Sequence, residues 1–302
     1  MNTKALVVKD NRLVEASYTL SLVEQRIVLM AIAWSRQNDL ELSCDTWVEL
    51  QACEYADMYK ITLDAAYKQL SNACESLQER KIKIMGVDRL TRAPAVYKSK
   101  WVTDAIYVQD VGVVRLKFSE MLVPYVSDLN THFTSYAIGS VSSLSTGYAI
   151  RMYELLAQYK TIGSRKILIG DLKDYLECDT PAYDRLDNFR RRVIDPALEQ
   201  INDCTDLTCT YETNKLGKRV VGFDFKIQIK QQNMKPLRTV KSNASSNKLL
   251  PAQGLSISER AMLRDLQAKH PDLTEKKVIQ MAKTQNKDVF MILYEIGKTG
   301  VV

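Results

Sequence analysis

Apolar positions recur at steps of three and four in several stretches of the chain, which is the spacing of amphipathic helices. The first such stretch follows Ser21, which stands three residues before Glu24, the spacing of a helix capping box. A second stretch covers Ala52 to Tyr59, and a third covers Asp64 to Arg80 after a tight turn. The pattern therefore predicts three helices in the first quarter of the chain.

Alternation of apolar and polar positions predicts strands beside these helices. We expect strands at Thr46 to Leu50 and in the K-I-K-I-M run from Lys81, then a polar, basic stretch from Gly86 to Lys100. A hairpin is expected at Trp101 to Val108 and Val113 to Phe118. Helix, strand, helix, turn, helix and hairpin is the order of a winged helix, in which the turn and the last helix form a helix-turn-helix.

The same order recurs after residue 130. Helical spacing predicts helices at Ser145 to Tyr159, Asp171 to Leu176 and, after a turn, Tyr183 to Thr205, with a strand at Lys166 to Ile169 and a hairpin at Leu207 to Tyr211 and Val220 to Ile229. We thus predict an α+β protein of two tandem winged-helix domains, 1–130 and 131–235. A polar, flexible linker over 236–254 and a small helical tail over 255–302 are expected to follow.

An alternative interpretation applies near the N-terminus, where four apolar residues stand seven positions apart: Leu13, Leu20, Ile27 and Trp34. A heptad of this kind is typical of a zipper-like dimer seam. The run Thr19 to Ser21 is expected to interrupt the helix, which favours a role in the core of the domain instead.

Charge and composition exclude several classes of protein. The net charge of +6 is concentrated towards the C-terminus, because residues 1–130 carry a net −1, residues 131–235 a net +2 and residues 236–302 a net +5. The six cysteines include no C-x-x-C pair and there are only two histidines, so we expect no metal site, no cofactor and no catalytic residue. The N-terminus lacks the apolar core of a signal peptide and no apolar run approaches the length of a membrane span. A cytoplasmic protein with reduced thiols and no membrane contact is expected.

The run from Tyr183 to Thr205, here called the basic helix, is the main candidate for function. Its predicted apolar stripe consists of Leu186, Phe189, Val193, Ala197 and Ile201. Pro196 should either kink the helix or start a second one with Asp195 as its N-cap.

The helical wheel separates the polar residues of the basic helix. The side opposite the stripe is expected to carry Arg185, Asn188, Arg192 and, at its margin, Arg191, whereas Arg190 falls near the edge of the stripe. A helix with one buried face and one face of Arg and Asn can lie in a DNA major groove, where Arg pairs with guanine and Asn with adenine. A solvated surface helix is the alternative for an Arg-rich sequence taken alone.

Four motifs, in this order, resemble those of the replication initiators of iteron-containing plasmids. They are N-R-L-V-E-A-S-Y-T-L-S-L-V-E-Q-R-I, A-Y-K-Q-L, Y-A-I-R-M-Y-E-L-L and F-R-R-R-V-I-D-P-A-L-E-Q-I-N, and the resemblance extends from about Asn11 to Lys230. It implies two winged-helix domains that bind direct-repeat iterons in double-stranded origin DNA. It further implies origin opening, recruitment of host replication proteins such as helicase and initiator, and a dimer, formed through the first domain, that represses the protein's own promoter at its operator DNA.

The resemblance also implies roles for individual residues. Arg190, Arg191 and Arg192 match the helix that reads the major groove, and the A-Y-K-Q-L match places Tyr67, Lys68 and Ser71 on the first domain's reading helix. Lys218 and Arg219, in the basic turn N-K-L-G-K-R, are expected to meet phosphate.

Two other functions remain open at this point. A transcriptional regulator of the same fold would bind an inverted repeat and have no role in initiation. An origin-nicking enzyme is disfavoured because His132 and His270 stand alone rather than as a metal-binding pair, and the chain has no G-x-x-x-x-G-K-[ST] motif for ATP-driven unwinding.

Overall fold

The computed structural model describes residues 1–87, 91, 93–109, 111–127, 129 and 131–230, together with 263, 267, 273–274, 277–281 and 296. The chain divides into one compact unit, Met1–Met234, and a second unit, Lys235–Val302. The linker predicted at 236–254 lies outside the described residues, as does most of the tail predicted at 255–302, in which residues 277–281 are helical.

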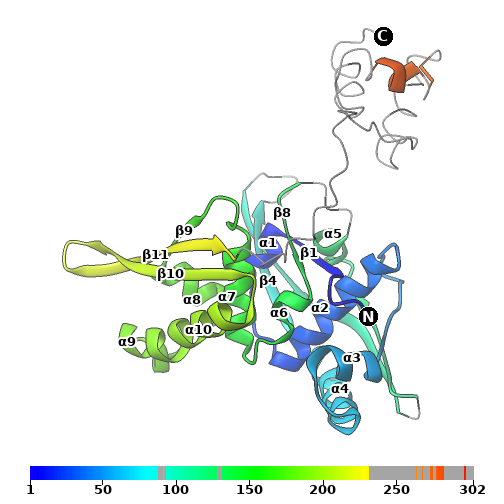
Figure 1. The fold of residues 1–302 in the computed structure, drawn as a ribbon, viewed down its shortest axis with the longest axis horizontal. Helices are drawn as coiled ribbons and strands as arrows, with labels where there is room; N and C mark the ends of the chain where they lie inside the picture. The colour runs from blue at the N-terminus through cyan, green and yellow to red at the C-terminus, as the bar shows by residue number, and fades with distance from the viewer. Residues whose placement is uncertain are drawn as a thin grey trace, which may run out of the picture. The chain divides into compact units, whose positions relative to one another are not determined.

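The first winged helix is built on the sheet β3-β7-β6. Figure 1 labels its helices α2, α3 and α4. Its elements are α2 (Leu22–Gln37), β3 (Val48–Gln51), α3 (Ala52–Tyr59), α4 (Leu63–Leu77), β6 (Val102–Val108) and β7 (Val113–Phe118). Ser21 and Glu24 form the predicted capping box at the start of α2, and the Thr62 side chain caps α4. The element order predicted for this half is confirmed.

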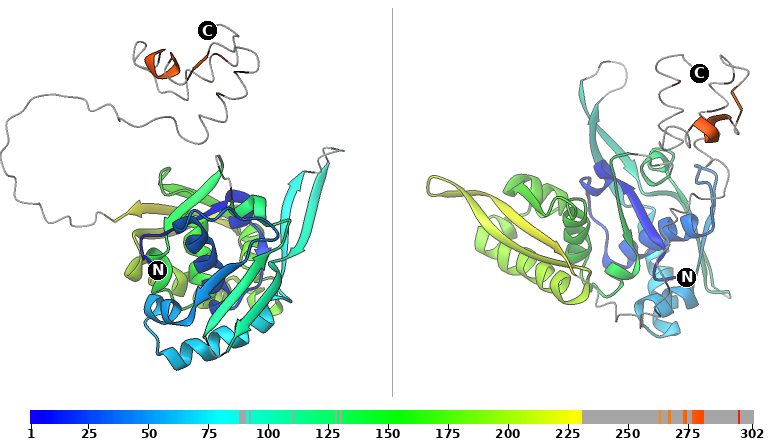
Figure 2. Two further views of the ribbon diagram at one scale, coloured as in Figure 1. Left: turned by 90° about the vertical axis from the view of Figure 1, so that its right-hand side faces the viewer. Right: turned by 45° about the horizontal axis from the view of Figure 1, so that its top comes forward.

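A second antiparallel sheet, β2-β4-β5, adds to this winged helix. β4 (Lys81–Val87) pairs along its whole length with β5 (Pro94–Lys100), and β2 (Ser17–Tyr18) lies on the other side of β4. The second half of the stretch predicted only as polar and basic, Gly86 to Lys100, is thus a strand, and alternate residues of β5 are half-buried. The two strands project from the domain as a ribbon (Figure 2).

The second winged helix repeats the order of the first around the sheet β10-β11-β9. Its elements are α7 (Gly147–Ala157), β9 (Ser164–Leu168), α8 (Ile169–Tyr175), η1 (Pro181–Tyr183), α9 (Leu186–Phe189), η2 (Arg190–Ile194), α10 (Asp195–Cys204), β10 (Leu207–Leu216) and β11 (Arg219–Ile229). β10 continues five residues beyond the predicted strand, so the hairpin is longer than its apolar alternation indicates.

Short elements join the two winged helices. They are β1 (Leu6–Asp10), α1 (Asn11–Val14), α5 (Val123–Val126), β8 (Phe133–Ala137) and α6 (Gly139–Ser142). β1 and β8 form an antiparallel pair in which Leu6 opposes Ala137 and Asp10 opposes Phe133. The start of the chain is thus paired with a segment that follows the whole of the first winged helix.

A cluster of charged and hydroxyl groups lies buried at this junction. The Glu154 carboxylate contacts the Lys9 ammonium at 2.6 Å and the Arg151 guanidinium at 3.3 Å, and it accepts a 2.5 Å hydrogen bond from the Tyr136 hydroxyl. Arg151 also donates to the Tyr18 hydroxyl at 2.5 Å. The three charged side chains are each at most 3% exposed, and they come from β1 and α7, so the cluster joins the two halves of the unit.

The N-terminal heptad belongs to the core rather than to a dimer seam. Leu13 and Ile27 are fully buried, Leu20 is 7% exposed, and Trp34 packs against the same core. The chain is not one continuous helix here, because β2 intervenes and α2 begins only at Leu22. The zipper alternative is therefore wrong for this chain.

Candidate nucleic-acid interface

The basic helix runs from Leu186 to Cys204 and begins three residues later than predicted. Arg185 precedes the helix in an extended conformation, and its carbonyl accepts hydrogen bonds from the amides of Asn188 and Phe189. Tyr183 belongs to the separate turn η1. Arg185 is thus an exposed cap residue rather than a member of the helix face on which the wheel placed it.

The middle of the basic helix is a π-helical segment, η2. The Asp195 amide bonds to the Arg190 carbonyl, five residues back instead of four, which widens the turn. This segment accommodates Pro196, which lacks an amide donor and whose ring would crowd the carbonyl of Arg192 in α-helical geometry. The prediction that Asp195 caps a second helix is wrong, since Asp195 is the first residue of α10 and follows η2 directly.

The wide turn also explains how the apolar stripe stays buried. Phe189, Val193, Ala197 and Ile201 are spaced by four throughout, and at about 100° per residue three such steps would rotate the stripe by roughly 120°. All four are at most 1% exposed. The wider turn reduces this rotation, because it has more residues per turn than an α-helix.

The arginines of the basic helix separate as the wheel predicted. Arg191 and Arg192 are exposed, whereas Arg190 is half-buried and its Nε donates to the Tyr211 hydroxyl at 2.9 Å. Asn188 is half-buried and its Nδ2 lies 3.5 Å from the Ala182 carbonyl, so it is less open to solvent than predicted. Their contacts with DNA stay a prediction.

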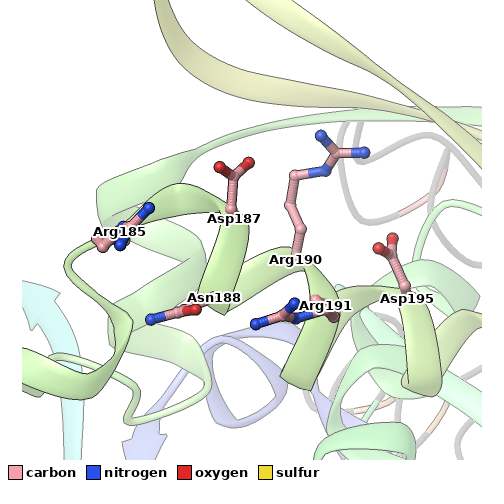
Figure 3. A pocket seen from close by; sticks show the side chains of 6 residues that line it. All are labelled: Arg185, Asp187, Asn188, Arg190, Arg191 and Asp195. Atoms are coloured by element: carbon pink, nitrogen blue, oxygen red, sulfur yellow. The ribbon is translucent and has the colours of Figure 1, made fainter.

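Part of the basic helix borders a hollow of about 480 Å³, here called the arginine hollow (Figure 3). Its lining residues are Arg185, Asp187, Asn188, Arg190, Arg191 and Asp195. Arg192 is not among them. Asp187 and Asp195 place two carboxylates among three guanidinium groups. The sequence pattern does not predict this arrangement, because it indicates Asp195 only as a helix cap.

Tyr211 on β10 is the other residue missed from the sequence. Its hydroxyl accepts from Arg190 and donates to Asp195 Oδ1 at 2.6 Å, so the second domain's hairpin contacts both ends of the π-helical segment. Burial, followed by the bond to Asp195, raises the pKa of Tyr211 above its ordinary value. The hydrogen bond that Arg190 donates to Tyr211 in turn raises the pKa of Arg190. Tyr211 occupies an ordinary position in an alternating strand, so no local signal distinguishes it from its neighbours.

The hairpin of β10 and β11 forms the wing of the second domain. Its turn is Gly217-Lys218, with Gly217 at a φ of 61°, which a glycine adopts without strain. Lys218 and Arg219 are exposed at this tip, as is Lys215 before it. Figure 1 shows the hairpin extending well beyond the helices of its domain. The tip therefore presents basic side chains at a distance from the arginine hollow.

The residues predicted to read DNA in the first domain lie on α4, as expected. Lys68 is exposed and Ser71 is half-buried. Tyr67 packs under the turn between β6 and β7, because a Cβ added to Gly112 would lie 2.2 Å from its Cε1. Gly112 has a φ of 65°, so this close approach requires glycine on two counts. Tyr67 thus also has a packing role in the wing of the first domain.

Neither a metal-binding group nor a membrane-spanning helix is found among the described residues. Among them, no group of three or more His, Cys, Asp and Glu side chains is placed to hold a metal ion. His132 is exposed, and His270 lies outside the described residues. Over the same part of the chain, no helix has the length and apolar character needed to cross a membrane.

Comparison with known proteins gives the family. The WH1 region of the initiator replication protein family matches residues 6–157, and the WH2 region of the initiator Rep protein matches residues 169–227. The chain belongs to the initiator replication protein family. Each of the two winged helices matches one winged-helix region of the family, and the predicted resemblance is confirmed.

Individual members of the family are distant in sequence. An uncharacterised 27.6 kDa protein of Escherichia coli is 27% identical over 72% of this chain and 93% of its own length. The PI protein of Escherichia coli is 24% identical over 76% of this chain and 84% of its own length. The crystal structure of Pi initiator protein in complex with iteron DNA superposes with a TM-score of 0.63 and 20% identity, covering 77% of this chain and all of that one. That structure supports the two-domain fold.

Proposed function

We propose that this initiator binds tandem iterons in origin DNA, with α4 and the basic helix in successive major-groove segments and the wing of the second domain on phosphate. The observation that carries the proposal is the exposure of Arg191 and Arg192 on a helix whose other side is fixed in the core. Exposed guanidinium groups held by a rigid element can pair with guanine edges. The solved complex of the Pi initiator protein with iteron DNA supports the same assignment.

Origin opening, recruitment of host helicase and initiator, and repression of the protein's own promoter by a dimer belong to the same proposal. Their support is the family membership. We assign no catalytic step to the chain itself. Incubation with supercoiled origin DNA and Mg²⁺ should leave no covalent protein–DNA adduct, and an adduct would replace this proposal with a nicking mechanism.

A comparison of two substitutions tests the division of labour. Arg192→Ala should cost about 1–3 kcal/mol of binding free energy and relax specificity at one base, whereas Lys218→Ala should weaken all sequences alike and lower the salt slope by about one. Binding is measured on a repeat-containing duplex and on random DNA over a range of salt concentrations. Equal losses on both DNAs for Arg192→Ala would contradict base reading by this residue.

A footprint across non-coding DNA of the replicon tests the wider function. Protection of several direct repeats spaced by whole helical turns is expected, since each repeat must present the same face of the duplex. Protection of a single inverted repeat alone would instead identify a transcriptional regulator.

A further inference from the structure

We infer that Tyr211 is a positioning residue for base recognition, which fixes the π-helical segment η2 and thereby the direction of the arginines that it carries. The inference rests on the proposed function, because it concerns how the basic helix meets DNA. It goes beyond that function by assigning specificity to a residue on the wing rather than on the basic helix.

The Tyr211 ring is held by the sheet. It packs at 5.3 Å and nearly perpendicular to the ring of Phe223, and at 5.9 Å from the ring of Phe225. Both phenylalanines are at most 1% exposed and belong to the core of the second domain. The hydroxyl of Tyr211 therefore occupies a position determined by the sheet rather than by the basic helix.

That hydroxyl bridges the two ends of the wide turn. It accepts from Nε of Arg190, the first residue of η2, and donates to Oδ1 of Asp195, the residue directly after η2. The backbones of these same two residues are joined by the five-residue hydrogen bond of the π turn. Tyr211 thus reinforces from outside a backbone bond of the kind that distinguishes this turn from an α-helical turn.

The reinforcement matters because π turns are rare and occur mostly as single turns within α-helices, as η2 does between α9 and α10. Arg191 and Arg192 lie within η2, so their directions depend on whether the turn is wide or α-helical. A wide turn spreads one rotation over more residues than the 3.6 of an α-helix, so its loss would redirect the side chains within it. A group that holds the wide turn therefore determines which base edges the two arginines can reach.

The same contact prepares Arg190 for a different task. Its Nε is engaged by Tyr211, and its guanidinium lies 5.6 Å from the centre of the Tyr211 ring. Within the described part of the chain, Nε makes the hydrogen bond of this side chain and its two terminal nitrogens make none. Arg190 is one of the residues that line the arginine hollow. Arg190 can therefore meet a phosphate without leaving Tyr211, while Arg191 and Arg192 are directed to bases.

The test is the loss of the hydroxyl alone. Tyr211→Phe keeps the ring and its packing on Phe223 and Phe225 but removes both hydrogen bonds. The matched control is Tyr153→Phe, which removes a 2.7 Å hydroxyl bond to Asp206 in the same domain and no hydrogen bond to η2. Asp195→Ala should reproduce the effect of Tyr211→Phe, and Asp195→Asn, which keeps an acceptor oxygen, should largely restore wild-type behaviour.

The measurement uses the full chain and a duplex that the wild-type protein selects from a random-sequence pool. Affinity is determined for this duplex, for each single-base variant of it and for a scrambled duplex. Tyr211→Phe should lose about tenfold in discrimination at one or two adjacent base pairs, the loss typical of a removed hydrogen bond to a charged group. Its affinity for the scrambled duplex and its salt slope should stay at wild-type values.

Three outcomes would overturn the inference. They are wild-type discrimination at every base pair in Tyr211→Phe, an equal loss of affinity for selected and scrambled duplexes, and an equal loss of discrimination in Tyr153→Phe. The exposed position of Asp195 makes its alanine variant a second measurement if Tyr211→Phe folds poorly. A wild-type protein that selects no duplex would instead refute the proposed function itself, which separates the two failures.

Discussion

Replacement of Glu154 by glutamine should destabilise the protein more than any other single isosteric change in the junction. The Glu154 carboxylate is 1% exposed and faces Lys9 at 2.6 Å and Arg151 at 3.3 Å, which are themselves 2% and 3% exposed. Glutamine keeps the shape and one acceptor oxygen but removes the negative charge. Two cations would then remain buried without their counter-ion, and the hydrogen bond from Tyr136 would lose its charged acceptor.

The size of the effect depends on the burial of the partners. Removal of one member of a buried ion pair costs about 3–5 kcal/mol, because the remaining charge has no solvent to replace its partner. Folded domains have total stabilities of about 5–15 kcal/mol, so Glu154→Gln should remove a third or more. With a slope of about 3 kcal/mol per molar urea, the unfolding midpoint should fall by about 1 M or more.

Urea unfolding of the full chain, monitored by circular dichroism, measures this shift. Glu49→Gln is the matched control, since Glu49 pairs with Arg115 at 2.8 Å but both side chains are at least 40% exposed, and its midpoint should not move measurably. Adding Lys9→Met to Glu154→Gln should cost less than the sum of the two single changes, because one of the unpaired cations is removed. A midpoint shift for Glu154→Gln no larger than that of Glu49→Gln would refute the buried ion pair as a stabilising contact.

Three further predictions concern other parts of the chain. Gly112→Ala should lower the stability of the protein by about 1–3 kcal/mol in thermal unfolding, because it combines a φ of 65° with a clash against Tyr67. Gly217→Ala is the control and should cost less, because Gly217 has a φ of 61° but open space around it. Equal costs would contradict the clash. Burial raises the pKa of Cys178 to about 11 and that of Cys209 to about 12, so a disulfide reagent at pH 8 should label only the exposed thiols of the native protein. Those thiols are Cys44, Cys53 and Cys204, and rapid labelling of all six cysteines would contradict the buried positions. Burial opposes ionisation of Glu154, but attraction to Lys9 and Arg151 outweighs this effect and lowers the Glu154 pKa. The carboxylate therefore stabilises the fold above about pH 4.3, and this contribution is lost as the pH falls through the folded-state pKa. The stability of the wild-type protein should thus fall more steeply in acid than that of Glu154→Gln.

The element order could be predicted because its signals are local. The capping box at Ser21 and Glu24, the alternation in β11 and the repeated helix-strand-helix-hairpin order each depend on neighbours a few residues apart. The separation of Arg190 from Arg191 and Arg192 could be predicted for the same reason, since it depends on their positions around one helix.

Features that depend on distant partners could not be predicted. β5 is a strand because it pairs along its length with β4, and its half-buried face carries only Ala95, Tyr97 and Ser99. Charged residues are ordinarily exposed, so nothing near Lys9 or Glu154 indicates that each is buried against the other. The spacing of four from Phe189 to Ile201 is consistent with a wide turn, but the sequence alone does not distinguish it from an ordinary α-helix. Only the hydrogen bond that forms η2 does so.

The pairing of the chain's first strand with residues beyond the first winged helix has a consequence for synthesis on the ribosome. Arg151 donates a hydrogen bond to the carbonyl of Ala16, which is synthesised 135 residues earlier. Lys9 and its counter-ion Glu154 are separated by a still longer stretch of chain. At about 5–20 residues per second, that delay is on the order of ten seconds. During this interval the nascent N-terminal segment has a lysine with no counter-ion and a strand with no partner. The first domain therefore completes its fold only when α7 emerges, and nascent chains halted before α7 should be captured by chaperones more readily than chains halted after it.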